Sequence, residues 1–200
     1  MEIQTLVVGE FAVNCYLLSQ NGEFLVVDPG GGFRRIKQAI DSYENSKVVG
    51  ILLTHGHFDH IGAVDKLVEE YHCPVYCCQE DEILLRNYKY NSMGPFGGTV
   101  SSEISWFNGS KLSLGSFDIE ILYTPGHTKG SCMFIIGNCL FSGDTIFRES
   151  IGRTDLYGGS CNQILQSIQI IRELPFDMAI YPGHEGATTV GHELQFNPFL

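Results

Sequence analysis

One short polar motif, placed directly after an apolar segment, constrains the fold of this chain more than any other feature. Residues 48–53 are apolar apart from Gly50, as expected of a buried strand. The following "THGHFDH" places three histidines and an aspartate within the six positions from His55 to His60. Because imidazole and carboxylate groups are good ligands for a borderline cation such as zinc, the motif predicts a metal site at the end of a strand.

The spacing inside the motif divides its candidate ligands into two pairs. His55 and His57 are two positions apart in extended chain, so their side chains point the same way and can hold one ion. Asp59 and His60 lie where the chain turns into a helix, so they can face a neighbouring point.

Three later residues occur in the same setting, a strand that ends in a glycine-bearing loop. They are His127 in "LYTPGHTKGS", Asp144 in "CLFSGDTIF" and His184 in "AIYPGHEG". Ligands at the ends of several strands converge on one edge of a sheet. We interpret the remaining histidines, His72 and His192, as ordinary surface residues.

Composition and charge exclude several classes of protein. We expect residues 1–200 to form one domain with a substantial core. A formal net charge of -11 argues against binding nucleic acid through its phosphates. The start "MEIQTLVVGE" does not read as a signal peptide, and no apolar stretch approaches the roughly 18 residues of a membrane helix. We therefore expect a cytoplasmic protein that binds neither nucleic acid nor membrane.

The seven cysteines are expected to be reduced thiols, several of them in apolar strand-like segments. The alternative is a soft-metal cluster formed by Cys73, Cys77 and Cys78, although no second pair has zinc-finger spacing.

Short strands alternate with helical segments along the chain, which predicts mixed sheets covered by helices. We expect helices over residues 33–43, 60–71, 80–86 and 161–174. We expect strands over residues 3–8, 15–19, 24–28, 48–53, 73–77, 104–107, 111–114, 117–123, 131–136, 139–142 and 178–182. Residues 87–102, from Asn87 at one end to Ser102 at the other, form one long irregular segment that is a candidate substrate-binding loop.

The joint pattern of "THGHFDH", "TPGHTKGS", "FSGDTIF" and "YPGH" resembles the metallo-β-lactamase fold superfamily. "GRTDLYGGS" and "NPFL" resemble its short glyoxalase II-like hydrolases, and the similarity extends from "NCYLL" to Leu200. The resemblance implies an α/β (α+β) fold, a four-layer αβ/βα sandwich of two mixed β-sheets with helices outside.

The resemblance also implies a set of metal ligands. His55, His57 and His127 would bind a first ion, Asp59, His60 and His184 a second, and Asp144 would bridge both. The expected cofactors are two divalent metal ions per chain, with zinc preferred and iron or manganese compatible. Asp59 would also orient the metal-bridging hydroxide.

Four residues are candidates for supporting the ligands. Asp28 could accept an imidazole N–H from a ligand histidine, and Thr54 could help in the same way. Asp28 could instead simply initiate the turn before Pro29. Arg153 and Asp155 in "GRTD" are interpreted as a buried ion pair that supports the Asp144 loop.

The implied function is a metal-dependent thioesterase that acts on S-lactoylglutathione or a related small thioester. The alternatives are a persulfide dioxygenase, with one iron held by His55, His127 and Asp144, and a non-catalytic metal-binding scaffold. A β-lactamase is disfavoured because the zinc-dependent branch with cysteine at position 144 is not matched.

Longer glyoxalase II enzymes carry a C-terminal helical domain that supplies cationic contacts to glutathione, whereas this sequence ends at "NPFL". We therefore expect weak recognition of the glutathione carrier and tolerance of other small acyl thioesters. The oligomeric state stays open.

Overall fold

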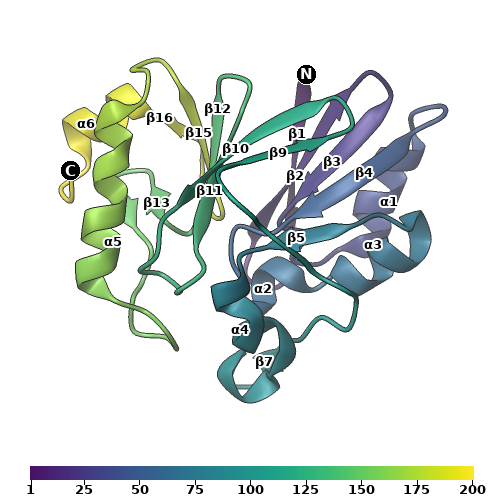
Figure 1. The fold of residues 1–200 in the computed structure, drawn as a ribbon, viewed down its shortest axis with the longest axis horizontal. Helices are drawn as coiled ribbons and strands as arrows, with labels where there is room; N and C mark the ends of the chain where they lie inside the picture. Colours follow the sequence, from purple (N-terminus) through teal and green to yellow (C-terminus); the bar gives the residue numbers. More distant parts are fainter.

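Two six-stranded sheets face each other in the computed structural model, which describes residues 1–200 (Figure 1). The first sheet has the strand order β1 (Glu2–Val8), β2 (Val13–Gln20), β3 (Glu23–Val27), β4 (Lys47–Leu52), β5 (Val75–Cys77) and β8 (Ser105–Trp106). Its first three strands form an antiparallel meander, and β3, β4, β5 and β8 run parallel. The sheet is therefore mixed.

The second sheet is also mixed. Its order is β16 (Thr188–Thr189), β15 (Ala179–Pro182), β12 (Cys139–Gly143), β11 (Cys132–Ile136), β10 (Phe117–Tyr123) and β9 (Lys111–Leu114). All neighbours in it are antiparallel except β12 and β15, which run parallel.

Helices cover the outer faces of both sheets (Figure 1). Against the first sheet lie α1 (Phe33–Asp41) and α3 (Val64–Tyr71), and against the second lie α5 (Cys161–Ser167), the 3₁₀ helix η3 (Ile168–Glu173) and α6 (Val190–Phe196). The sequence pattern of β2 shows how the layers form, because successive side chains of a strand point to opposite faces. Val13, Cys15 and Leu17 pack toward the helix layer, whereas Tyr16 and Leu18 pack between the sheets.

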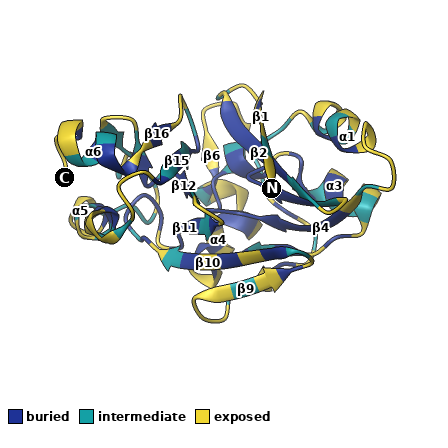
Figure 2. Ribbon diagram, turned by 90° about the horizontal axis from the view of Figure 1, so that it is seen from above, coloured by how far each residue is buried: buried dark blue, intermediate teal, exposed yellow.

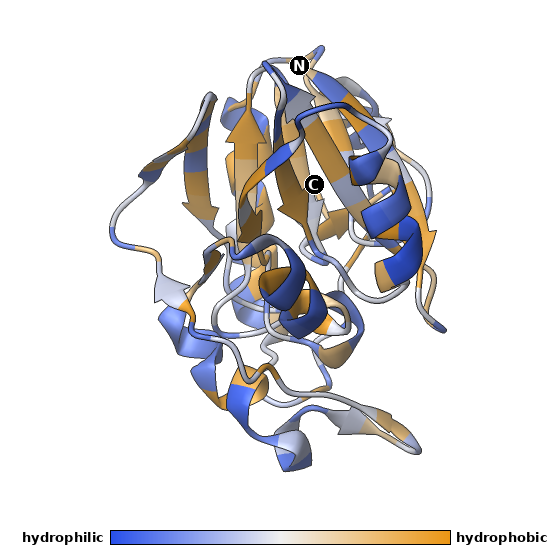
Figure 3. Cartoon of the chain, turned by 90° about the vertical axis from the view of Figure 1, so that its right-hand side faces the viewer, coloured by the Kyte–Doolittle hydropathy of each residue, from blue (hydrophilic) through white to orange (hydrophobic).

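Three hydrophobic clusters correspond to the three interfaces between four layers. One lies under α1 and α3, one lies between the sheets, and one lies under α5, η3 and α6. Figure 2 shows the buried strands between exposed helix faces, and Figure 3 shows the same division as hydrophobic strands and hydrophilic outer helix surfaces. The predicted four-layer αβ/βα sandwich is confirmed.

Several element boundaries differ from the prediction. The helix expected over residues 60–71 is divided into α2 (Phe58–Ile61) and α3, because the loop after β3 presses against it: the Ala63 N–H donates to the Pro29 carbonyl at 2.9 Å. The helix expected over residues 161–174 continues as η3 after Ser167. Strand β16 and helix α6 were not predicted, and α6 begins where the Thr189 side chain accepts the His192 N–H.

The irregular segment 87–102 contains short structure of its own. It holds the 3₁₀ helix η2 (Tyr88–Tyr90) and a small hairpin of β6 (Ser92–Met93) and β7 (Phe96–Gly97). It follows η1 (Gln79–Asp81) and α4 (Glu82–Arg86), and a second small hairpin, β13 (Ile146–Phe147) with β14 (Ser150–Ile151), follows β12. None of the helices has the length and apolar character needed to cross a membrane.

Candidate metal centre

The loops after four strands meet at one edge between the two sheets. His55 and His57 follow β4 of the first sheet. The other loops leave the second sheet, with His127 after β10, Asp144 after β12 and His184 after β15. The strand ends thus bring residues from distant parts of the sequence into one place, as the sequence predicted.

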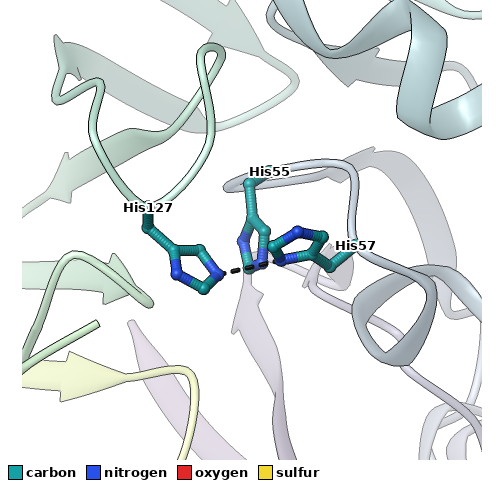
Figure 4. A group of neighbouring side chains, drawn as sticks. All are labelled: His55, His57 and His127. Atoms are coloured by element: carbon teal, nitrogen blue, oxygen red, sulfur yellow. Dashed lines mark hydrogen bonds between the residues drawn. The ribbon is translucent and has the colours of Figure 1, made fainter. Parts of the chain in front are cut away.

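The first group of candidate ligands is His55, His57 and His127, which point toward one another in Figure 4. One ring nitrogen from each lies within 4.8 Å of the others. Nδ1 of His57 is 2.9 Å from Nε2 of His127. All three side chains are buried, with at most 5% of each residue exposed.

The second group is Asp59, His60 and His184, whose ligand atoms also lie within 4.8 Å of one another. Nε2 of His184 lies 3.5 Å from Oδ2 of Asp59. His60 is fully buried, whereas the side chains of Asp59 and His184 are 16% and 22% exposed. The second group therefore lies closer to solvent than the first.

Asp144 lies between the two groups. Its Oδ2 is 3.5 Å from Nε2 of His127 and 3.5 Å from Nε2 of His184, and its Oδ1 is 3.3 Å from Nε2 of His60. Gly183 permits this approach, since a Cβ there would lie 2.2 Å from Oδ1 of Asp144. The carboxylate can contact an ion in either group.

Four buried polar atoms at this place have no hydrogen-bond partner: Nε2 of His55, His57 and His60, and Oδ1 of Asp144. Buried polar atoms nearly always have a hydrogen-bond partner, so four atoms without one in a single cluster need an explanation. Imidazole nitrogens and a carboxylate oxygen are donors to metal ions. The residues present therefore fit one or two divalent cations.

The electrostatics of the first group favour neutral imidazoles. Burial lowers the pKa of His55 well below its ordinary value, and the neighbouring His60 and His127 lower it further. Burial likewise lowers the pKa of His57 to about 3, with His127 adding to the effect. Neutral imidazole is the form that binds a metal ion.

The second group differs because carboxylates surround its imidazoles. Burial opposes the charge on His60, but Asp144, Asp28 and Asp59 together hold its pKa well above the ordinary value. Burial would raise the pKa of Asp144, yet His60, then His127 and His55, hold it well below the usual range. An ion that binds through Nε2 of His60 must displace any proton on that nitrogen. The positive charge of the ion would then balance the neighbouring carboxylates in place of the proton.

Asp28 and Thr54 lie behind the ligands. Oδ2 of Asp28 is 3.0 Å from Nδ1 of His60. Thr54 donates its N–H to Oδ1 of Asp28 at 2.8 Å and its hydroxyl to Oδ2 at 2.6 Å, and that hydroxyl lies 3.0 Å from Nδ1 of His55. The pair fixes the unbound nitrogens of two candidate ligands, which is how a metal-ligating histidine is oriented.

Arg153 and Asp155 form the predicted ion pair, but the expectation that it is buried is wrong. The guanidinium donates to both carboxylate oxygens at 2.7 Å, and the two side chains are 52% and 67% exposed. Support for the site comes from the backbone instead, because the Arg153 carbonyl lies 2.7 Å from Nδ1 of His127. While paired with Asp155, the Arg153 side chain also lines the cavity in front of the ligands.

That cavity has a volume of about 580 Å³ and contains His57, Asp59, His127, Asp144 and His184 in its wall. Its other walls are largely apolar, formed by Phe11, Ala12, Phe58, Met93, Phe147 and Leu156, with Arg153 and Glu185 as the remaining charged residues. Met93 is the residue of segment 87–102 that reaches this cavity. Tyr157 lies in an adjoining hollow with Lys89 and Tyr90.

Buried polar side chains that sequence reasoning missed hold the ligand loops. Asn14 donates to the carbonyls of Pro182 and Glu185, on either side of His184. Asn91 donates to the Gly56 carbonyl and accepts the Phe58 N–H, on either side of His57. No local pattern marks these residues, although Asn14 could be suspected as a polar residue inside the apolar "VNCYLL".

All seven cysteines are free, five of them buried, and no group of potential metal ligands includes one. The alternative of a soft-metal cluster is therefore not supported by the structure. His72 and His192 lie outside the candidate centre, as predicted.

Known proteins are similar to this chain over most or all of its length. The model of the metallo-beta-lactamase superfamily matches residues 8–184. The hydroxyacylglutathione hydrolase GloC of Haemophilus influenzae is 35% identical, with 100% of this chain and 98% of the relative covered. The crystal structure of the BLEG-1 B3 metallo-beta-lactamase has a TM-score of 0.94 at 34% identity, covering 100% and 99% of the two chains. TTHA1623, crystallised in a di-iron-bound form, has a TM-score of 0.83 at 30% identity, covering 98% and 100%.

Proposed function

The chain belongs to the metallo-beta-lactamase superfamily, and from this premise we propose that it is a metal-dependent thioesterase of glyoxalase II type. Its substrates would be S-acyl-glutathione or related small thioesters. The observation that carries the proposal is the position of Asp144 between two complete groups of ligating side chains, each with its own histidines.

In this proposal His55, His57 and His127 would hold one ion, Asp59, His60 and His184 would hold the other, and Asp144 would contact both. When bound, such ions would supply Lewis acidity and a water whose pKa is lowered from ~15.7 toward ~7. Zinc, iron and manganese all suit histidine and carboxylate ligands. The di-iron-bound TTHA1623 supports keeping iron among them.

Asp59 is the proposed catalytic carboxylate. It lines the cavity, and the nearby histidines hold its pKa below the usual range against the effect of burial, so it stays ionised. An ionised carboxylate at this place can accept a hydrogen bond from the attacking water and orient it. A thiol leaving group has a pKa of about 8.5, so it departs as the thiolate without a strong general acid.

The remaining cavity residues would bind the substrate. Phe11, Met93, Phe147 and Leu156 can pack against the acyl group and exclude water. Arg153 lines the cavity but is paired with Asp155, so an anionic group of the substrate would share or displace that carboxylate, and Lys89 in the adjoining hollow offers a second cation for a carboxylate of the thiol carrier. Two cations near the cavity are consistent with a carrier such as glutathione, which has two carboxylates.

A β-lactam is a second candidate substrate class. The supporting observation is the similarity to the BLEG-1 B3 metallo-beta-lactamase over almost the full length of both chains. The mononuclear-iron persulfide dioxygenase is less well supported, because the group of Asp59, His60 and His184 would then have no ion to bind.

The test is one panel of substrates on one sample of known metal content. It contains S-D-lactoylglutathione, acyl esters of other thiols, a β-lactam and glutathione persulfide with oxygen. We expect the thioesters to be hydrolysed fastest, and Asp118→Asn, which changes an exposed strand residue far from the ligands, to keep that activity. Faster β-lactam cleavage, or persulfide oxidation with one iron per chain, would overturn the proposal.

A further inference from the structure

Asp81 is a buried carboxylate close to the first ligand group that does not belong to it. It ends the 3₁₀ turn η1, which follows β5 and the buried Cys78, and only 1% of it is exposed. It does not belong to any group of potential metal ligands. Burying a carboxylate is costly unless it is hydrogen-bonded, so its partners indicate its purpose.

Those partners are the two loops that carry the first group. Oδ2 of Asp81 accepts the Gly56 N–H at 2.8 Å and the Thr128 hydroxyl at 2.7 Å, and Oδ1 accepts the Gly130 N–H at 2.8 Å. Gly56 lies between His55 and His57, and Thr128 follows His127. One carboxylate therefore joins the loop after β4 to the loop after β10, which come from different sheets.

The contact is close and its surroundings are ordered by further hydrogen bonds. A Cβ at position 130 would lie 2.7 Å from Cγ of Asp81. The loop after β10 can therefore approach Asp81 this closely only because residue 130 is glycine. The Thr128 hydroxyl also lies 2.8 Å from Oγ of Ser131. Asn91 donates to the Gly56 carbonyl at 2.8 Å, so both the N–H and the carbonyl of Gly56 are hydrogen-bonded to side chains.

We propose that Asp81 is a positioning residue for the first metal site, which sets the separation of His127 from His55 and His57 by holding both of their loops. The inference rests on the proposed metal centre but not on the identity of the substrate. Ligands must be held within about 0.5 Å of a productive geometry, and partners behind the ligands typically account for about 10- to 100-fold in metal affinity. A hydrogen bond from a backbone N–H to a carboxylate is strong enough for this role.

The test uses Asp81→Asn, which keeps the size of the side chain. The amide has one acceptor and one donor end, so either the Gly56 N–H or the Gly130 N–H must face an NH₂ group. We expect one of two Zn²⁺-binding steps, measured in competition with a chromophoric chelator, to weaken by about 10- to 100-fold. The visible absorption of the Co²⁺-loaded variant should also change, because it depends on ligand geometry.

Glu193→Gln is the matched control. Glu193 is equally buried and accepts the Glu149 N–H, the Thr188 hydroxyl and the Asn197 amide, but it holds helix α6 rather than a ligand loop. We expect Glu193→Gln to lower the melting temperature while leaving Zn²⁺ affinity and the Co²⁺ spectrum as in the wild type. Equal losses of affinity in the two variants would mean general destabilisation and would overturn the positioning role.

If Asp81→Asn does not fold, Thr128→Val is measured instead, because it keeps the carboxylate and both backbone hydrogen bonds but removes the hydroxyl donor. A several-fold weaker Zn²⁺ affinity supports the inference, and wild-type affinity overturns it. A wild-type protein that binds Zn²⁺ but hydrolyses no thioester refutes the proposed function and leaves this inference standing. A wild-type protein that binds no divalent ion refutes both.

Discussion

Nδ1 of His60 lies 3.0 Å from Oδ2 of Asp28, while Nε2 of the same ring lies 3.3 Å from Oδ1 of Asp144. One nitrogen of the imidazole thus has a hydrogen-bond partner behind the ring, whereas the other faces the candidate metal centre without a hydrogen-bond partner. The carboxylate behind fixes which nitrogen carries a proton when an ion is bound, and so leaves Nε2 free as a ligand.

Asp28→Asn should weaken Zn²⁺ binding about 10- to 100-fold without unfolding the protein. Asp28 has a φ of 49°, a left-handed conformation that asparagine tolerates, so the backbone can be retained. Chelator competition and circular dichroism on the same sample measure the two effects. An affinity equal to that of the wild type would show that Asp28 serves only the turn before Pro29.

Asp59→Asn should lower kcat for thioester hydrolysis by at least about 10²-fold, the scale for loss of a key catalytic group. The variant keeps the side-chain shape but removes the charge that orients water and contributes to the second group. Steady-state kinetics with normal circular dichroism is the measurement. Near-normal activity in a folded variant would rule out the catalytic assignment of Asp59.

Met93→Ala should change acyl preference more than it changes metal content. Met93 lines the cavity from segment 87–102, and its sulfur is 4.0 Å from the Arg153 guanidinium. Enlarging this wall should raise kcat/KM for bulkier acyl groups relative to the lactoyl ester. Tyr88→Ala is the control, because Tyr88 belongs to the same segment but does not line that cavity. The same shift in both variants would exclude a specific role for Met93.

The cysteines should differ sharply in reactivity toward an alkylating reagent. Cys161 is exposed and should be modified first, whereas Cys15, Cys73, Cys77 and Cys132 are buried. Burial raises the pKa of Cys73 to about 11. Because the thiolate is the reactive form, the raised pKa means that labelling of Cys73 should be slow at pH 7 and rise about tenfold per pH unit up to pH 9. Mass spectrometry of the modified native protein measures this, and rapid labelling of Cys73 at pH 7 would contradict the burial.

The sequence predicts the layers of this fold and the place of the centre because both depend on strong local signals. Strand β2 is mostly apolar and β10 alternates buried apolar with exposed residues, and the candidate ligands all lie within the loop or short helix that follows a strand. What the sequence could not reveal depends on contacts between distant segments. The break between α2 and α3 comes from the Pro29 carbonyl, and the exposure of Arg153 depends on how its loop lies against the cavity.

The positioning residues escaped prediction for the same physical reason. Asp81, Asn14 and Asn91 act through hydrogen bonds to backbone groups. Almost every residue type carries the same backbone groups, so the sequence does not indicate which of them will be the partner. Asp81 stands in "QEDEILL", where a charged residue reads as the start of an ordinary surface helix. Only the folded chain shows that its side chain turns inward.

The number of metal ions per chain tests the central claim of two ligand groups joined by Asp144 most directly. We expect elemental analysis of protein purified without chelator to find close to two divalent ions per chain. Asp144→Ala should lower the occupancy of both sites together, because its carboxylate contacts His127 of one group and His60 and His184 of the other. One ion per chain with full thioesterase activity, or loss of a single ion in Asp144→Ala, would contradict the dinuclear centre.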